Sequence, residues 1–253
     1  MITRFGHKTI RFITELGNIT LFLQRILRNF FNKSNHSERT IHQMLILGIK
    51  SLNITLITSV FVGMAFAVQV VKELLELGAA QLIGYIIGLA VWRELAPLLT
   101  AVVVAGRVGS AISAELGTMK VTEQVEALES MSQNVVDYLV VPRVIACTLM
   151  LPLLVGLADV AGFLGGFLVS IGTGQVNPYA FFDSAGSMLG VMDIAGGLIK
   201  AMFFGFVISV ISCYMGLSAS GGAKGVGEVT IKAVVTSLIT IFILNYFLSL
   251  VIF

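Results

Sequence analysis

Five long apolar runs constrain the fold of this 253-residue chain more than any other feature. A helix needs about 20 apolar residues to cross the hydrocarbon core of a bilayer, and the runs cover residues 51–71, 82–106, 144–171, 198–223 and 233–253. Only 12% of the residues are charged, about half the share of a soluble domain. The sequence therefore predicts an all-α membrane protein with five transmembrane helices. It argues against a soluble enzyme, a nucleic-acid-binding protein and a disordered chain.

The basic residues predict how the chain is oriented. Most of the sixteen lysines and arginines precede the first run or lie between runs two and three or between runs four and five, whereas the other side receives Lys72 and Lys200. Cytoplasmic loops of membrane proteins carry the excess of positive charge. We therefore expect the N-terminus on the cytoplasmic or stromal side and the C-terminus on the opposite side.

Residues 1–50 have the pattern of an amphipathic helix followed by a linker. Apolar residues recur there at helical spacings and share one face: Phe5, Phe12, Leu16, Ile19, Leu23, Ile26 and Phe30. A basic amphipathic helix just before a span is expected to lie in the headgroup plane. A soluble helix that packs on another domain and an amphipathic targeting peptide are the alternatives.

Charged residues inside the apolar runs are candidates for function, because charge at membrane depth is costly. Arg93 and Glu94 interrupt the second run. They either pair with neighbouring helices as a structural polar cluster or line a cavity for a charged ligand. Pro97 follows one turn later and is expected to kink or break the helix. Asp159 in the third run is either an interhelical hydrogen-bonding residue or the proton site of an ion-coupled carrier.

The loop between the second and third spans predicts a short amphipathic helix over residues 114–131. Leu116, Met119, Val125 and Leu128 form its apolar side. Four glutamates give it an acidic surface, at positions 115, 123, 126 and 129. Such a helix either docks into the groove of a cytoplasmic partner or is a solvated connection.

No motif for catalysis or phosphate binding is present. The glycine-rich stretch Gly221–Gly227 lacks the order of a phosphate-binding loop, so we expect a flexible turn there. All three histidines precede the first span, which predicts no metal site within the membrane. We therefore expect a non-catalytic chain that binds no cofactor of its own.

Three motifs resemble the MlaE family of permeases, the membrane subunits of lipid-transporting ABC systems. They are FVGMAFAVQ (Phe61–Gln69), WRELAP (Trp92–Pro97) and AGRVGSAISAELGTMKVTEQVEAL (Ala105–Leu128). The resemblance covers nearly the whole chain. Ala96 departs from the pattern, because many members carry glycine there.

The resemblance implies a homodimer with a phospholipid cavity between its two copies, near which the motifs place Gln69, Arg93, Glu94 and Pro97. It also implies a separate cytoplasmic ATPase that binds ATP and Mg²⁺, and an MCE-domain protein that exchanges lipid with the dimer. Residues 114–131 would then be a coupling helix that contacts the ATPase through Glu115, Gly117, Met119, Glu123 and Gln124.

The family implies a location in a bacterial inner membrane or the plastid inner envelope membrane. Two other functions stay open for the chain: an ion-coupled secondary carrier and a membrane scaffold that transports nothing. The carrier alternative is weak, because only Glu94 and Asp159 lie deep in the predicted spans.

Overall fold

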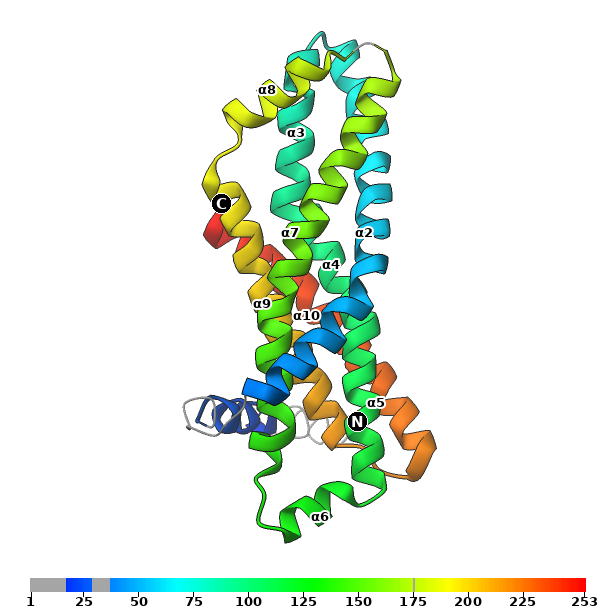
Figure 1. Ribbon diagram of the computed structural model, residues 1–253, viewed down its shortest axis with the longest axis vertical. Helices are drawn as coiled ribbons and strands as arrows, with labels where there is room; N and C mark the ends of the chain where they lie inside the picture. Colours follow the sequence, from blue (N-terminus) through cyan, green and yellow to red (C-terminus); the bar gives the residue numbers. More distant parts are fainter. Residues whose placement is uncertain (1–16, 29–36, 175) are drawn as a thin grey trace, which may run out of the picture.

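The computed structural model describes residues 17–28, 37–174 and 176–253, and all regular structure in these ranges is helical. A helix over 17–28 precedes the labelled elements of Figure 1. These are α2 (Ser37–Glu76), η1 (Ala80–Leu82), α3 (Ile83–Ala90), η2 (Val91–Leu95), α4 (Ala96–Val104), η3 (Ala105–Gly109), α5 (Ser110–Val121), α6 (Gln124–Ser130), η4 (Val136–Val140), α7 (Val141–Gly172), α8 (Pro178–Met188), α9 (Val191–Leu217) and α10 (Gly222–Ile252).

Among the described residues, five helical stretches are long and apolar enough to cross a membrane, which confirms the five-span all-α prediction. They are Glu38–Glu76, Ala80–Val121, Val136–Gly172, Val191–Leu217 and Gly222–Ile252. The helices extend beyond most apolar runs, because polar flanking residues continue the backbone hydrogen bonding. The fourth helix begins and ends earlier than the run over 198–223. The fifth begins well before residue 233.

The glycine-rich stretch after the fourth span is a turn at its first two residues, Gly221 and Gly222, which both have a positive φ. Gly221 adopts a left-handed conformation with a φ of 83°, which glycine reaches without steric cost. The helix α10 then starts at Gly222. It packs against α5, where a Cβ at Gly117 would lie 3.3 Å from Val226 Cγ1. The expected flexible turn over Gly221–Gly227 is therefore wrong, because tertiary packing holds most of these residues in a helix.

The most extensive helix–helix contact is between α2 and α7, which lie side by side (Figure 1). Their backbones touch: a Cβ at Gly63 would lie 2.0 Å from the carbonyl oxygen of Gly162. Small residues permit this close approach in membrane helices. The other face of α7 packs against α9, where Gly205 meets the backbone of Cys147. The helix α7 therefore lies between α2 and α9 and packs against both.

The helix over 17–28 lies across the end of the bundle that carries α6 (Figure 1). Its Phe22 and Ile26 are buried, and the Phe22 ring meets Tyr214 of α9 edge-on with 5.6 Å between centroids. Leu21 and Leu27 are exposed. One apolar side therefore packs on the bundle and other apolar side chains stay accessible. Four predicted members of the amphipathic face, Phe5, Phe12, Leu16 and Phe30, lie outside the described residues, and the interfacial position stays a prediction.

Candidate functional site

Arg93 and Glu94 occupy η2, a single wide π-helical turn inside the second span. Such turns are frequent at functional sites. The two side chains do not pair with each other. Arg93 Nε donates a hydrogen bond of 2.7 Å to Asp193 Oδ1, and Glu94 Oε1 accepts one of 2.7 Å from Lys200 Nζ. Two ion pairs thus join the second span to α9.

The ammonium of Lys200 is the centre of the charge network, which we define as Arg93, Glu94, Asp193, Lys200, Asn245 and Ser249. Lys200 is fully buried. Its Nζ contacts the Arg93 carbonyl oxygen at 3.0 Å, Glu94 Oε1 at 2.7 Å and Ser249 Oγ at 2.7 Å. An ammonium has three N–H donors, so every donor of this buried charge has an acceptor.

Pro97 explains why the carbonyl of Arg93 is available to Lys200. A proline lacks the N–H that would bond to the carbonyl four residues earlier, and that carbonyl belongs to Arg93. The Lys200 ammonium donates to it instead. The expected kink or break takes another form: the chain stays helical through Pro97, and the wide turn η2 lies just before it.

The last helix closes one side of the network. Asn245 Nδ2 donates to Glu94 Oε2 over 2.9 Å. The Ser249 hydroxyl lies 2.8 Å from Glu94 Oε1. The Phe253 ring covers the guanidinium of Arg93, with 4.3 Å from Cζ to the ring centroid, which is a cation–π distance. The network therefore joins three helical stretches that are far apart in the sequence.

The structure brings Arg93 and Glu94 together with two charges that sequence reasoning did not select. Asp193 is buried and also accepts a 2.7 Å hydrogen bond from the Gly190 amide at the start of α9. The apolar run that begins at 198 predicts Lys200 near a span end on the outer side. The helix α9 begins at Val191 and places both residues inside the protein. Their spacing of seven residues, two turns on one helix face, was the available signal.

The arrangement is the polar cluster that was one of two alternatives for Arg93 and Glu94, and its formal charges cancel. It is not sealed, however. The side chains of Arg93 and Glu94 are 34% and 41% exposed, whereas those of Asp193 and Lys200 are 9% and 0% exposed. One edge of the network can therefore contact a further group.

Gln69 lies apart from the network. It is exposed on α2. The start of η2, at Val91, is level with Ser59 of α2, because both contact Gly162. Gln69 lies ten residues further along α2 than Ser59, which is about 15 Å along the helix axis. Pro97, in contrast, is buried against α9 at Gly197. Of the four residues assigned to the cavity, the structure therefore gathers Arg93, Glu94 and Pro97.

Asp159 differs from the network, because it is buried and neither carboxylate oxygen has a hydrogen-bonding partner among the described residues. The expectation of an interhelical hydrogen bond is therefore wrong. The neighbouring Ala158 carbonyl makes the contact between helices instead, by accepting a 2.8 Å bond from Ser59 Oγ. With Asp193, at least three acidic groups lie inside the spans rather than two.

The predicted coupling helix over 114–131 is two helices. The helix α5 ends at Val121, and Glu123 has a left-handed φ of 61° before α6 begins at Gln124. An ion pair between Lys120 and Glu126 crosses this break. The hydrogen bond from Lys120 lowers the pKa of the Glu126 carboxyl. The segment therefore has a fixed bend instead of a straight axis.

The apolar side chains of this segment face the core. Leu116 and Val125 are buried in the core, and Met119 and Leu128 pack against it. Of the five residues assigned to the ATPase contact, Glu115, Glu123 and Gln124 are exposed. Gly117 is buried and Met119 is half-buried.

Comparison with known proteins identifies the family. The family described as Permease MlaE matches residues 40–251. A probable ABC transporter permease protein of Synechocystis is 46% identical over 93% of this chain and 94% of its own length. A probable ABC transporter permease protein of Rickettsia typhi is 40% identical over 98% and 96%. The chloroplastic protein TRIGALACTOSYLDIACYLGLYCEROL 1 of Arabidopsis thaliana is 46% identical over 85% of this chain and 61% of its own length. With its five candidate spans, the chain belongs to the MlaE family of ABC transporter permeases.

Proposed function

We propose that this permease moves phospholipid, or a related lipid, as a homodimer driven by a separate ATPase. The observation that carries the proposal is the half-exposed edge of the charge network beside an apolar surface. On α10, Tyr246, Phe247 and Leu250 are exposed and lie next to Asn245 and Ser249, which hold Glu94. Charge and apolar surface are thus adjacent.

This combination suits a phospholipid, which has a charged headgroup and apolar tails. A lipid site needs an apolar wall with a few polar groups at one end. Arg93 supplies a guanidinium that can bind a phosphate group, and the α10 surface supplies the wall. A second copy of the chain placed against this surface would shield both from the bilayer.

The energy source in this proposal is a cytoplasmic ATPase that holds ATP and Mg²⁺ and docks on the segment around α6. Glu115, Glu123 and Gln124 present polar groups there. Gly117 and Met119 keep the segment on the core. An MCE-domain protein on the far side would exchange lipid with the dimer, in a bacterial inner membrane or a plastid inner envelope membrane.

Reconstitution with the ATPase tests the proposal directly. We expect ATP hydrolysis to move a labelled phospholipid across vesicles that contain both subunits. Omission of ATP, or an ATPase without hydrolytic activity, is expected to stop the movement. Phospholipid movement that depends on an imposed ion gradient and does not depend on ATP would instead identify an ion-coupled carrier. Assembly without movement of lipid in either arm would identify a scaffold.

Arg93→Ala tests the lipid site. We expect less phospholipid to co-purify with the complex, because the group that binds the headgroup is lost. Arg107→Ala serves as a control, because Arg107 is an exposed arginine of the same span. An unchanged lipid content in Arg93→Ala would remove this residue from the site.

Glu123→Lys tests the docking surface. We expect transport to uncouple from ATP hydrolysis while membrane insertion is kept, because an exposed acidic contact becomes basic. Glu73→Lys makes the same charge change on α2 at an exposed position outside the α5–α6 segment. Equal transport and ATPase association in Glu123→Lys and wild type would contradict the coupling role.

A further inference from the structure

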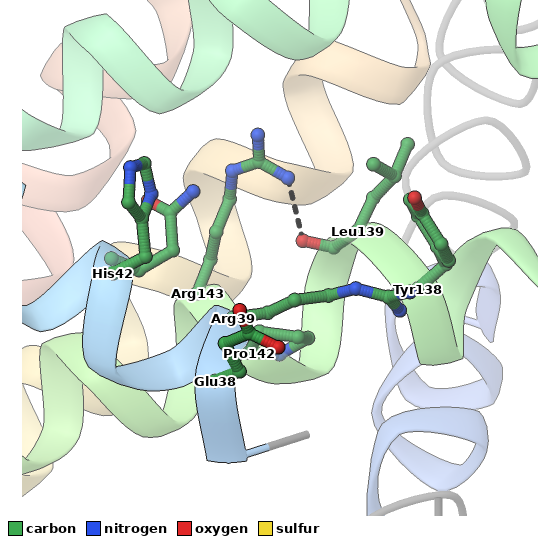
Figure 2. Close-up of a pocket in the computed structure, with 8 residues that line it drawn as sticks. Glu38, Arg39, His42, Tyr138, Leu139, Pro142 and Arg143 are labelled. Atoms are coloured by element: carbon green, nitrogen blue, oxygen red, sulfur yellow. Dashed lines mark hydrogen bonds between the residues drawn. The ribbon is translucent and has the colours of Figure 1, made fainter. Parts of the chain in front are cut away.

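A polar pocket lies between the start of α2, η4 and the start of α7 (Figure 2). Its volume is about 440 Å³, within the range of small-ligand sites. It is separate from the charge network. Leu198, two residues before Lys200 of the network, is level with Gly156 of α7. Arg143, in the pocket wall, lies about 20 Å from Gly156 along the axis of α7.

Arg143 is the buried charge of this pocket. Its side chain is only 6% exposed. Nη1 donates 2.7 Å to the Leu139 carbonyl oxygen, as Figure 2 shows, and Nη2 lies 3.1 Å from Glu115 Oε2 of α5. Nε has no hydrogen-bonding partner among the residues that the structure describes. A guanidinium has five N–H donors, so this buried cation has donor capacity left over.

Two further groups add positive charge or donors to the wall. Arg39 extends from α2 over the ring of Tyr138 (Figure 2), with Cζ 3.7 Å from the ring centroid. Stacking through its face orients the guanidinium and leaves the N–H edge for a ligand. His42, one turn later on α2, also lines the pocket. Glu38 is the acidic group of the lining, and Glu115, outside the lining, already pairs with Arg143.

The apolar parts of two candidate spans begin next to the pocket, which predicts that it lies at the level of lipid headgroups. Arg143 directly precedes the apolar run that starts at Val144, and residues 38–42 precede the apolar part of α2. A groove with two guanidinium groups at the edge of the hydrocarbon region is a site for a phosphate group, because guanidinium donors match phosphate oxygens.

We propose that this pocket binds a phosphate group through Arg39 and Arg143, with an anionic lipid headgroup or free phosphate as its source. The bound group would contact the N–H donors of Arg143 that Leu139 and Glu115 leave over, and it would share that guanidinium with Glu115. Because Glu115 belongs to α5, occupancy of the pocket would be sensed next to the α5–α6 segment. The proposal does not depend on lipid transport.

Binding of defined probes to the purified full-length protein tests this site. Phosphatidylglycerol and phosphatidylcholine are titrated into delipidated protein and bound lipid is counted by native mass spectrometry, while radiolabelled inorganic phosphate is measured by equilibrium dialysis. We expect wild type to prefer phosphatidylglycerol. Competition by inorganic phosphate would identify the free anion as sufficient. Binding of phosphatidylglycerol without such competition would identify the lipid headgroup as the source.

Two variants should change this binding in opposite directions. Arg39→Gln is expected to weaken phosphatidylglycerol binding by about tenfold, and its exposed position makes unfolding a minor concern. Glu115→Gln is expected to tighten binding several-fold, because Arg143 loses its competing carboxylate. Lys50→Gln, which removes an exposed charge of α2 outside the pocket, should bind as wild type does.

The proposal is overturned if wild type and Arg39→Gln bind both probes equally, or if phosphatidylcholine binds as tightly as phosphatidylglycerol. Neither result would affect the proposed transport function, because the charge network and the pocket are probed by different variants. Loss of ATP-driven lipid movement with intact, Arg39-dependent phosphatidylglycerol binding would in turn leave the pocket assignment in place.

Discussion

The charge network and Asp159 are two ways in which this protein buries ionisable groups. In the network, each of the four charged side chains meets an opposite charge, and Lys200 has all its donors satisfied. Asp159 on α7 is buried like Asp193 and Lys200, but its oxygens have no hydrogen-bonding partner among the described residues. Burial of a charge is tolerated when it is paired and costly when it is not. The comparison therefore predicts opposite responses to mutation.

Lys200→Met should give the largest effect. Removing one partner of a buried pair costs about 3–5 kcal/mol, and we expect the lower end, because Glu94 is 41% exposed. The unfolding free energy in a detergent denaturation series measures this loss. Lys232→Met, at an exposed position of α10, is the matched control and should stay near wild type. A loss of similar size in both variants would mean that the network adds nothing specific.

Asp193→Ala should have the next largest effect, a loss of about 2 kcal/mol. The variant removes the ion partner of Arg93 and the acceptor of the Gly190 amide, and a lost helix-capping group alone costs about 1 kcal/mol. The same denaturation series measures it. Asp183→Ala on α8 is exposed and controls for loss of an acidic side chain.

Asp159→Leu should change the unfolding free energy in the opposite direction to the two network variants. An unpartnered buried polar group is replaced by an apolar one of similar size, so the unfolding free energy should rise by about 1 kcal/mol. Asp183→Leu should show no such gain. A lower unfolding free energy for Asp159→Leu than for wild type would contradict the proposed difference between Asp159 and the charge network. Increased stability together with lost transport would show that Asp159 is kept for function.

Loss of the ion pair between Lys120 and Glu126 should have the smallest effect on stability. The pKa of Glu126 is lowered in the folded chain by the hydrogen bond from Lys120. The ion pair therefore stabilises the folded segment above the ordinary glutamate pKa of 4.5. This stabilisation is lost as the pH falls through the lowered pKa of Glu126. Hydrogen exchange of α6 measures it: Glu126→Gln should exchange slightly faster than wild type at pH 7, and the difference should disappear in acid. A difference that grows in acid would contradict the pair.

The sequence predicted the parts of the site that depend on local pattern. Arg93 and Glu94 interrupt an apolar run, and the spacing of Leu116, Met119, Val125 and Leu128 placed one face of the α5–α6 segment on the core. Asp193 and Lys200 were missed, because the apolar run starts later than the helix. The turn at Glu123 was missed, because a left-handed glutamate carries no residue-type signal.

The sequence by itself determined the five spans, the amphipathic face of the α5–α6 segment and the family, because these follow from local hydropathy, helical periodicity and matching motifs. Only the tertiary structure decided which charges meet. Arg93 and Asp193 are 100 residues apart, and Glu94 and Asn245 are 151 apart. Periodicity reports which face of a helix is apolar, but it carries no information on which distant helix lies against that face. Helix packing brings these groups within hydrogen-bonding distance, and it also places Arg39 beside Tyr138. Within the described ranges it leaves Nε of Arg143 without an acceptor.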